Sequence, residues 1–185
     1  MVISPRAAGA TCACVAAMLI AGPHAQTPAL VIEVADYMAM PITGAAGGTG
    51  QTDGMLARVN GFIEEPGGAD RVFVNDLNGP LYILDKKSKH LSTYLDFNGR
   101  DGRPGLFRRL AFAVGYANGL VTVAFDPDYR RNGRFYTVHV EEPAVAAAAL
   151  PDNARLPSLD LTGYTTTAAV VTPGDIQREA VLIEW

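Results

Sequence analysis

Residues 119–140, GLVTVAFDPDYRRNGRFYTVHV, decide the fold. In the first half, Val121, Val123 and Phe125 alternate with small or polar residues, which is the period-two pattern of a strand with two different faces. Residues 134–140 alternate in the same way. The stretch therefore predicts two antiparallel strands that form a β-hairpin.

The residues between these two strands favour a turn. Asp126-Pro127-Asp128 ends the first strand, because proline cannot donate to a strand ladder and aspartate bonds to nearby backbone groups. Asn132-Gly133 supplies the positive backbone angles that let the chain reverse. We expect a connection of about seven residues rather than a minimal two-residue turn.

Upstream of the hairpin, the sequence predicts four short strands joined by tight turns. The strands are expected at residues 57–63, 71–75, 80–85 and 90–97, with turns at 65–68, 76–79 and 86–89. Four strands joined in this way form an antiparallel meander, which is the unit of one β-propeller blade. The pattern therefore places the chain in the all-β class.

Less regular chain separates and follows these elements. Residues 98–109 carry three glycines and one proline and are predicted to form a loop, followed at 110–114 by a short strand or a helical turn. We expect an irregular excursion over 141–157, in which 144–149 has the composition of a short helix. A weakly β-like stretch over 159–177 and a final strand over 179–185 complete the prediction.

The first 25 residues have the features of a secretory signal peptide. Arg6 is their only charge, residues 7–22 are apolar or small, and Ala25 precedes the expected cleavage at Gln26. The apolar run is shorter than the ~20 residues of a membrane span, and a retained anchor is the alternative. We expect a periplasmic or secreted protein with no membrane association after cleavage.

Residues 26–54 are expected to be a flexible N-terminal segment. Residues 30–32 are predicted to form a short strand, and residues 44–54 have the composition of a Gly-rich linker. A phosphate-binding loop is the alternative at 44–54, but the Lys-Ser/Thr ending of that motif is missing. The folded domain is expected over residues 55–185.

Charge and cysteine content exclude several classes of function. Cys12 and Cys14 both lie in the signal peptide, so the mature chain has no cysteine for disulfides, thiol catalysis or thiolate metal sites. Cleavage removes one basic and no acidic residue, which changes the formal net charge from −4 to −5. This acidic balance argues against nucleic acid as a partner.

The hairpin and the meander together resemble the glucose/sorbosone dehydrogenases over residues 57–140, and the resemblance extends towards Trp185. It rests on a Gly-Leu-x-x-x-Ala-Phe strand, an x-Pro-Asp-Tyr turn, an Asn-Gly pair and an aromatic strand, with two upstream strands at 71–74 and 81–85. The residues that carry the match are Gly119, Leu120, Ala124, Phe125, Pro127, Asp128, Tyr129, Asn132, Gly133, Phe135 and Tyr136.

This resemblance implies a six-bladed β-propeller that oxidises sugars with pyrroloquinoline quinone (PQQ) and calcium. Residues 55–185 would then be antiparallel meanders forming roughly the first two blades of an incomplete six-bladed β-propeller. The family's histidine base lies downstream of the region matched by 179–185. We therefore expect an N-terminal portion of a PQQ-dependent sugar dehydrogenase that is inactive by itself, binds neither PQQ nor calcium, and self-associates through exposed blade edges.

Two positions depart from the family pattern. Ala117 stands where the family has a glutamine that contacts PQQ, and Asp126 stands where histidine is frequent, although Asn118-Gly119-Leu120 is retained. No catalytic or metal-ligating residue is therefore assigned within this chain, and its cofactor-binding residues stay unassigned.

The three histidines do not replace the missing base. His24 belongs to the signal peptide, and His90 follows a lysine-rich turn and is expected at the surface. His139 shares a strand face with Phe135 and Thr137, where a packed or partly exposed structural role is expected.

Two groups of acidic and amide residues suggest metal sites. Asp76, Asn78 and Asp85 have part of a calcium-loop pattern, but Val74 stands where its first carboxylate is required, so a hairpin turn is favoured. For the pair at 126 and 128, a solvated turn is likewise favoured over metal ligation.

Charged residues cluster in two further places. Arg100, Arg103, Arg108 and Arg109 form a basic loop that would suit the carboxylates of PQQ, although a solvated loop is favoured. The pair at 141–142, both glutamate, is expected to be a strand end without a partner. Two other functions stay open: a propeller that only binds, which Ala117 would fit, and a self-standing β-sandwich.

Overall fold

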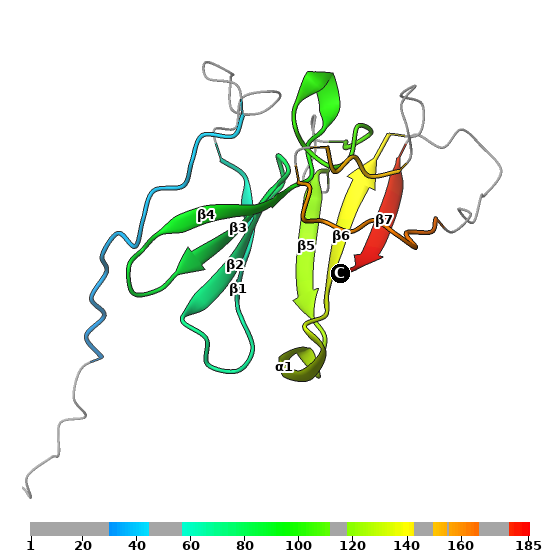
Figure 1. Ribbon diagram of the computed structural model, residues 1–185. Coiled ribbons are helices and arrows are strands. Elements are labelled where there is room, and N and C mark those ends of the chain that lie inside the picture. The colour runs from blue at the N-terminus through cyan, green and yellow to red at the C-terminus, as the bar shows by residue number, and fades with distance from the viewer. Residues whose placement is uncertain (1–29, 45–56, 112–117, 143–149, 155, 167–177) are drawn as a thin grey trace, which may run out of the picture. The chain divides into compact units, whose positions relative to one another are not determined.

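The computed structural model describes residues 30–44, 57–111, 118–142, 150–154, 156–166 and 178–185. Over these residues the chain is all-β, as predicted, with two antiparallel sheets of four and three strands and little helix (Figure 1). The chain divides into two compact units, residues 1–36 and Tyr37–Trp185, and both sheets lie in the second unit. A search of the described residues for a long apolar helix that could span a membrane finds none.

In the first unit, residues 30–36 form no strand. The side chains of Leu30, Val31 and Ile32 are all at least 74% exposed. The short strand predicted at 30–32 is therefore wrong. Branched apolar residues do not make a strand by themselves, because the backbone groups of a strand need a partner strand.

The four-stranded sheet is the predicted meander. Its strands are β1 (Val59–Glu64), β2 (Arg71–Asp76), β3 (Pro80–Asp85) and β4 (Leu91–Asp96), in the order β1-β2-β3-β4. Every boundary lies within two residues of its predicted position. Both faces of β2 are covered, because Phe73 packs into one apolar cluster while Val72 and Val74 pack into another.

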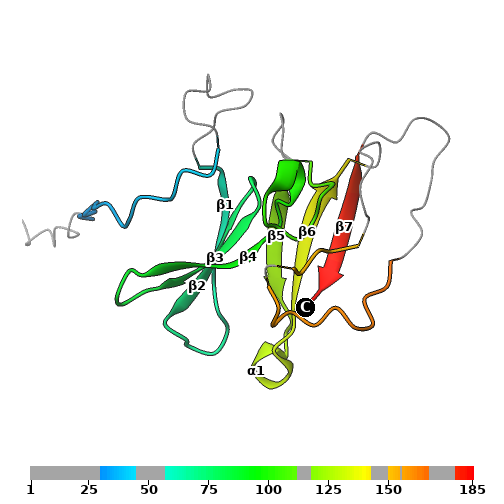
Figure 2. The same cartoon turned by 45° about the horizontal axis from the view of Figure 1, so that its top comes forward.

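The predicted hairpin is present in the three-stranded sheet. β5 (Leu120–Phe125) and β6 (Phe135–Glu141) pair antiparallel, and the predicted last strand, β7 (Glu179–Glu184), pairs with the other side of β6. Figure 2 shows β6 between its two neighbours. The turn holds a short helix that was not predicted, α1 (Tyr129–Asn132), which ends at Gly133 with a φ of 70°.

A β-bulge changes the face pattern predicted for β5. The register shifts between Leu120 and Thr122, so Val121 has no partner in the ladder. Leu120 and Val123 join the buried core cluster and Val121 does not. The expectation that Val121 shares a face with Val123 and Phe125 is therefore wrong, because the extra residue at the bulge reverses the alternation.

One apolar core lies between the two sheets. Phe73 of β2 is central to it, with its ring centroid 4.9 Å from that of Phe125 and 5.8 Å from that of Phe135. The core strands contribute Phe73, Leu81, Leu95, Leu120, Val123, Phe135 and Ile183. Because both sheets contribute, they are packed face to face.

The segment at 98–109 is more ordered than a loop prediction implies. It contains a turn of 3-10 helix, η1 (Arg100–Gly102), and an isolated parallel bridge between Asn98 and Phe107. Leu106, Phe107 and Leu110 are at most 1% exposed and belong to the core. The segment therefore fastens the end of β4 to the second sheet.

Three sets of contacts fix β5 and its turn against the first sheet. At one end, Gly119 lies so close to Leu77 that a β-carbon would overlap the Leu77 carbonyl oxygen. At the same end, the buried Asn75 side chain donates to the carbonyl oxygen of Leu120, the first residue of β5, at 2.7 Å. At the other end, the Tyr129 hydroxyl donates to Glu65 at 2.7 Å.

The outer face of the first sheet, the one turned away from the second sheet, is covered by residues 37–43, which we call the strap. Met38 and Met40 pack on Val72, Val74, Tyr82 and Leu84. The strap is fastened at one end by the hydrogen bond that the Thr43 hydroxyl donates to Asp76 at 2.6 Å. At the other end the Lys89 ammonium lies 3.3 Å from the centre of the Tyr37 ring.

Candidate functional site

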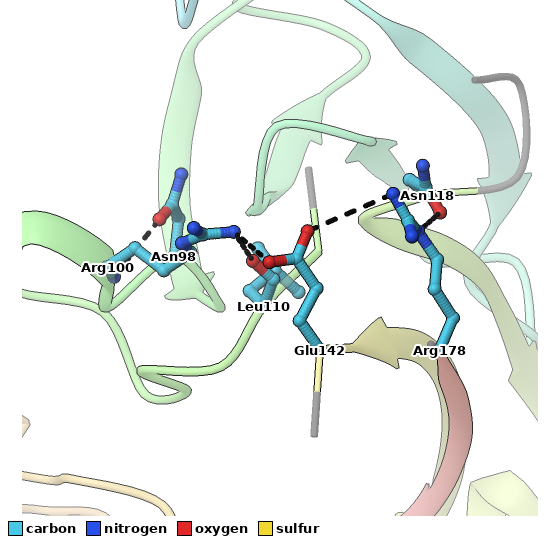
Figure 3. Close-up of polar contacts among 6 residues, drawn as sticks. All are labelled: Asn98, Arg100, Leu110, Asn118, Glu142 and Arg178. Atoms are coloured by element: carbon cyan, nitrogen blue, oxygen red, sulfur yellow. Dashed lines mark hydrogen bonds and ion pairs between the residues drawn. The ribbon is translucent and has the colours of Figure 1, made fainter. Parts of the chain in front are cut away.

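Charged side chains gather at the end of the second sheet where β5 begins, β6 ends and β7 begins. They come from segments far apart in the sequence: the 98–110 segment, residues 141–142 at the end of β6, and residues 178–179 at the start of β7. The neutral amide of Asn118, just before β5, lies among them. Figure 3 shows the part of this cluster around Glu142. Antiparallel pairing brings these segments together, because the start of β5 and β7 must lie beside the end of β6.

The cluster has two layers. We call Arg100, Glu142 and Arg178 the outer layer, and Glu142 is at its centre. Its carboxylate accepts from the Arg100 guanidinium at 2.9 Å and lies 4.0 Å from that of Arg178. Arg100 also donates to the carbonyl oxygen of Leu110 at 3.3 Å, and Arg178 donates to the side-chain oxygen of Asn118 at 3.0 Å (Figure 3). The glutamate therefore bridges two arginines that are themselves tied to the backbone or to an amide.

We call Arg109, Glu141 and Glu179 the inner layer, and Arg109 is at its centre. Its guanidinium lies 3.2 Å from a carboxylate oxygen of Glu141 and 2.9 Å from one of Glu179. The Arg109 and Glu141 side chains are only 14% and 6% exposed, so this pair is largely shielded from water. Buried charges persist only when they are paired, which makes this layer a structural ion-pair group.

His139 lies behind Glu141 and is fully buried, which confirms the predicted packed position. Its Nε2 is 3.1 Å from a Glu141 carboxylate oxygen, and its ring packs on Phe107 with centroids 4.2 Å apart. Within the described chain its Nδ1 has no hydrogen-bond partner. A general base needs access to its substrate, so the buried His139 is not placed to act as one.

These contacts correct two expectations from the sequence. The segment with Arg100, Arg108 and Arg109 is not simply a solvated basic loop, since each of the three is paired with an acid. Arg108 pairs with Asp152 at 2.5 Å. The glutamates at 141–142 were expected to lack a partner, yet both bind arginine, because the loop packs against the end of β6.

The same contacts bear on whether the described residues fit PQQ. The inner and outer layers contain three arginines and three glutamates, so they offer no net positive charge to an anionic cofactor. Ala117, the position of the family's glutamine, lies outside the described residues. The six residues of these two layers therefore do not fit a carboxylate-bearing cofactor such as PQQ, and no step of a reaction is assigned to them.

The candidate calcium residues are explained by turns. Asp76 and Asp85 lie at opposite ends of the β2–β3 hairpin, because Asp85 pairs in register with Arg71. The Asp76 carboxylate accepts from the Asn78 backbone amide at 2.8 Å, while Asp85 accepts from Ser88. The Ser88 bonds hold the pKa of Asp85 below its ordinary value.

The other predicted positions are as follows. Asp126 caps the turn by accepting from the backbone amide of Asp128 at 2.7 Å, and this bond holds the pKa of Asp126 below its ordinary value. His90 is exposed, as predicted. His24, the predicted signal peptide, most of the predicted Gly-rich linker and residues 144–149 lie outside the described chain. Within the described residues, no group of three or more histidines, cysteines or acids is placed to hold a metal ion.

Comparison with known proteins identifies no relative: no family model, no curated protein and no solved structure matches this chain. The arginine–glutamate cluster was missed in the sequence because its partners are distant, with Arg100 and Glu142 separated by 42 positions and Arg109 and Glu179 by 70. One feature of the sequence could have indicated the cluster: several arginines occur in one loop, and a similar number of glutamates occur near the ends of two predicted strands.

Proposed function

We propose that this chain is part of an exported β-propeller of the glucose/sorbosone dehydrogenase type, and that it supplies two neighbouring blades. The observation that carries the proposal is the start of β5. Asn118-Gly119-Leu120, which the family shares, stands at the polar end of the second sheet, and its glycine makes the close approach to Leu77 that no other residue allows. Two antiparallel sheets packed face to face also suit adjacent blades.

In this proposal the whole protein oxidises an aldose or a sorbosone-type sugar with PQQ and calcium. The histidine base and most contacts to the cofactor come from other blades. The arginine–glutamate cluster stiffens the loops at the polar end of the second sheet, and the present chain is inactive by itself.

A propeller that binds a partner without catalysis is the second candidate. The observation that favours it is the neutralisation of Arg100, Arg109 and Arg178 by glutamates of the same chain. Arginines that are already paired give a carboxylate-bearing cofactor less to bind.

The test compares this chain with the complete gene product. Each is supplied with PQQ and calcium, and reduction of an artificial electron acceptor is measured with a panel of aldoses. We expect turnover by the complete protein and none by this chain. Turnover by this chain would refute the proposal that it supplies only two blades. A complete protein without PQQ-dependent turnover would favour the second candidate.

Export is a separate part of the proposal. It rests on Arg6 and the apolar run at 7–22. Mass spectrometry of the exported protein should find an N-terminus close to Gln26. An exported protein that still begins at Met1 would show that the segment is not cleaved.

A further inference from the structure

Two methionines fasten the middle of the strap to the first sheet. No backbone–backbone hydrogen bond joins residues 37–43 to another described residue, so the attachment depends largely on side chains. Met38 and Met40 both pack on the sheet, while Ala39 between them is exposed. The surface beneath them, which we call the outer cluster, consists of Val72, Val74, Tyr82 and Leu84.

The other contacts of the strap are polar and lie at its two ends. The Thr43 hydroxyl donates to Asp76 at 2.6 Å and accepts from the Asn78 side chain at 2.9 Å. The Lys89 contact is made with Tyr37, which is 48% exposed. The remaining large apolar residue of the strap, Ile42, is 63% exposed and buries little surface. The two thioethers are therefore the apolar anchors of the strap.

The methionines are accessible, but the surface beneath them is not suited to their oxidised form. Each methionine is only partly buried, whereas Val72 and Leu84 beneath them are fully buried. Three of the four side chains of the outer cluster are aliphatic and cannot donate a hydrogen bond. A sulfoxide in either position would place a strongly polar oxygen against this surface, which is unfavourable without a donor.

We propose that Met38 and Met40 form a peroxide-sensitive latch, in which oxidation of both to methionine sulfoxide releases the strap and uncovers the outer cluster. The oxidant is hydrogen peroxide. A sulfur lone pair attacks one peroxide oxygen, the S–O bond forms as the O–O bond breaks, and the departing oxygen takes the proton of the transferred hydroxyl and leaves as water. Sulfur loses two electrons and the peroxide gains them.

The latch predicts that the two oxidations are coupled. If the sites were independent, the second oxidation would be slower than the first, because only one target is left. In the latch, the first sulfoxide loosens the strap and exposes the other thioether. We therefore expect the second oxidation to be about 3-fold or more faster than the first, so that the singly oxidised chain hardly accumulates.

Mass spectrometry of a peroxide time course measures this coupling on peptides that contain both methionines. In Met38→Leu, Met40 should be oxidised at the slow rate of the first step, because leucine keeps the strap anchored and does not react with peroxide. In denaturant the order should revert to that of independent sites, with the second step the slower one. Together these rates separate a latch from two methionines that happen to be accessible.

Release of the strap has a readout of its own in the binding of a dye that fluoresces on apolar surfaces. Peroxide should raise the dye signal about 3-fold in the native chain and in Met55→Leu, whose substitution lies outside the strap. The double variant Met38→Leu, Met40→Leu should show no rise. The double variant Met38→Gln, Met40→Gln, which carries polar side chains of similar length, should give the high signal without peroxide.

A local change should leave the second sheet intact. Trp185 reports on that sheet, because its indole nitrogen donates to Thr137 at 2.8 Å and its ring packs on Phe135. Its fluorescence should stay native in the oxidised chain, and methionine sulfoxide reductases should restore the low dye signal. This inference depends on the strap and not on PQQ chemistry, so it and the function proposed above can fail separately.

Several results would overturn the latch. One is a folded chain in which Met55 is oxidised while Met38 and Met40 are not. Others are a second oxidation slower than the first, a doubly oxidised chain with the dye signal of the native one, or a double leucine variant that responds to peroxide like the native chain. Loss of the native Trp185 fluorescence on oxidation would show general unfolding in place of strap release.

Discussion

The backbone of Gly119 lies directly against the carbonyl group of Leu77, with a φ of +97° that L-residues rarely adopt. This contact places the start of β5 on the β2–β3 turn, and with it the polar end of the second sheet. Gly119→Ala should therefore be costly for two reasons, the strained backbone and the overlap with Leu77.

The matched control for this prediction is Gly133→Ala. Gly133 also has a positive φ, of 70°, but a β-carbon there would meet nothing within 4 Å. We expect Gly119→Ala to lower the free energy of unfolding by roughly 1–3 kcal/mol more than Gly133→Ala. Denaturant titration of both variants measures the difference. Equal losses would show that the Leu77 contact relaxes without cost.

Asn75 should be important for the packing of the two sheets. It is 1% exposed, and its amide donates to the carbonyl oxygens of Leu120 at 2.7 Å and Val121 at 3.3 Å, which the bulge leaves available. Asn75→Ala should cost about 1–3 kcal/mol, because the Leu120 carbonyl is left buried without this donor. The exposed Asn60, which also donates to Val121, is the control. Asn60→Ala should cost under about 1 kcal/mol, since water replaces its bond.

The contact that Glu65 makes with Tyr129 of α1 is expected to weaken in acid. Its carboxylate accepts from Arg71 at 2.6 and 2.5 Å and from Tyr129 at 2.7 Å. The Arg71 bonds, helped by Tyr129 and opposed by burial, hold the pKa of Glu65 below its ordinary value of 4.5. A depressed folded-state pKa means that this stabilisation is present above the unfolded-state pKa and is lost as the pH falls through the folded-state value.

The check is a pH series of unfolding titrations on the native chain and on Glu65→Gln. The difference in the free energy of unfolding between the two should be largest near neutral pH and should shrink as the pH falls below 4.5. A difference that stays constant from neutral to acidic pH would mean that the ionised carboxylate is not what holds Tyr129.

The strands were predicted well from the sequence, because the alternation of residues that indicates a strand lies within the strand itself. The alternation in 71–75, 80–85 and 134–140 has the period of the strands that form there. The bulge at Val121 has no such local signal, since it depends on the carbonyl groups that Asn75 and Asn60 bind from another sheet. Helix α1 is only four residues long, too short for a periodic pattern.

The candidate site could be predicted much less well than the strands. Arg100 and Arg109 occur in a Gly-rich segment whose composition suggests a solvated loop. Their partners are fixed only when β6 and β7 pair and the segment folds over their ends. Pairing over such distances depends on the tertiary fold, which a single sequence read locally does not contain.

The last prediction concerns Arg109 and tests whether the arginine–glutamate cluster stabilises the fold or is a ligand site. Arg109→Met removes the positive charge that pairs with Glu141 and Glu179 but keeps most of the apolar stem. Because the Glu141 side chain is 6% exposed, its carboxylate would be left buried without the arginine, at a cost of about 3–5 kcal/mol. The control, Arg131→Met, breaks a pair with Asp128 in which the arginine is 80% exposed, and should cost under about 0.5 kcal/mol. Adding Glu141→Gln to Arg109→Met should restore part of the loss, since it removes the buried charge that Arg109 neutralised and leaves an amide beside the His139 imidazole. Chemical denaturation of the four proteins measures these differences.

If the two single arginine variants were equally stable, the pairing of Arg109 would contribute little to the fold, and its charge would be available to an anionic ligand after all.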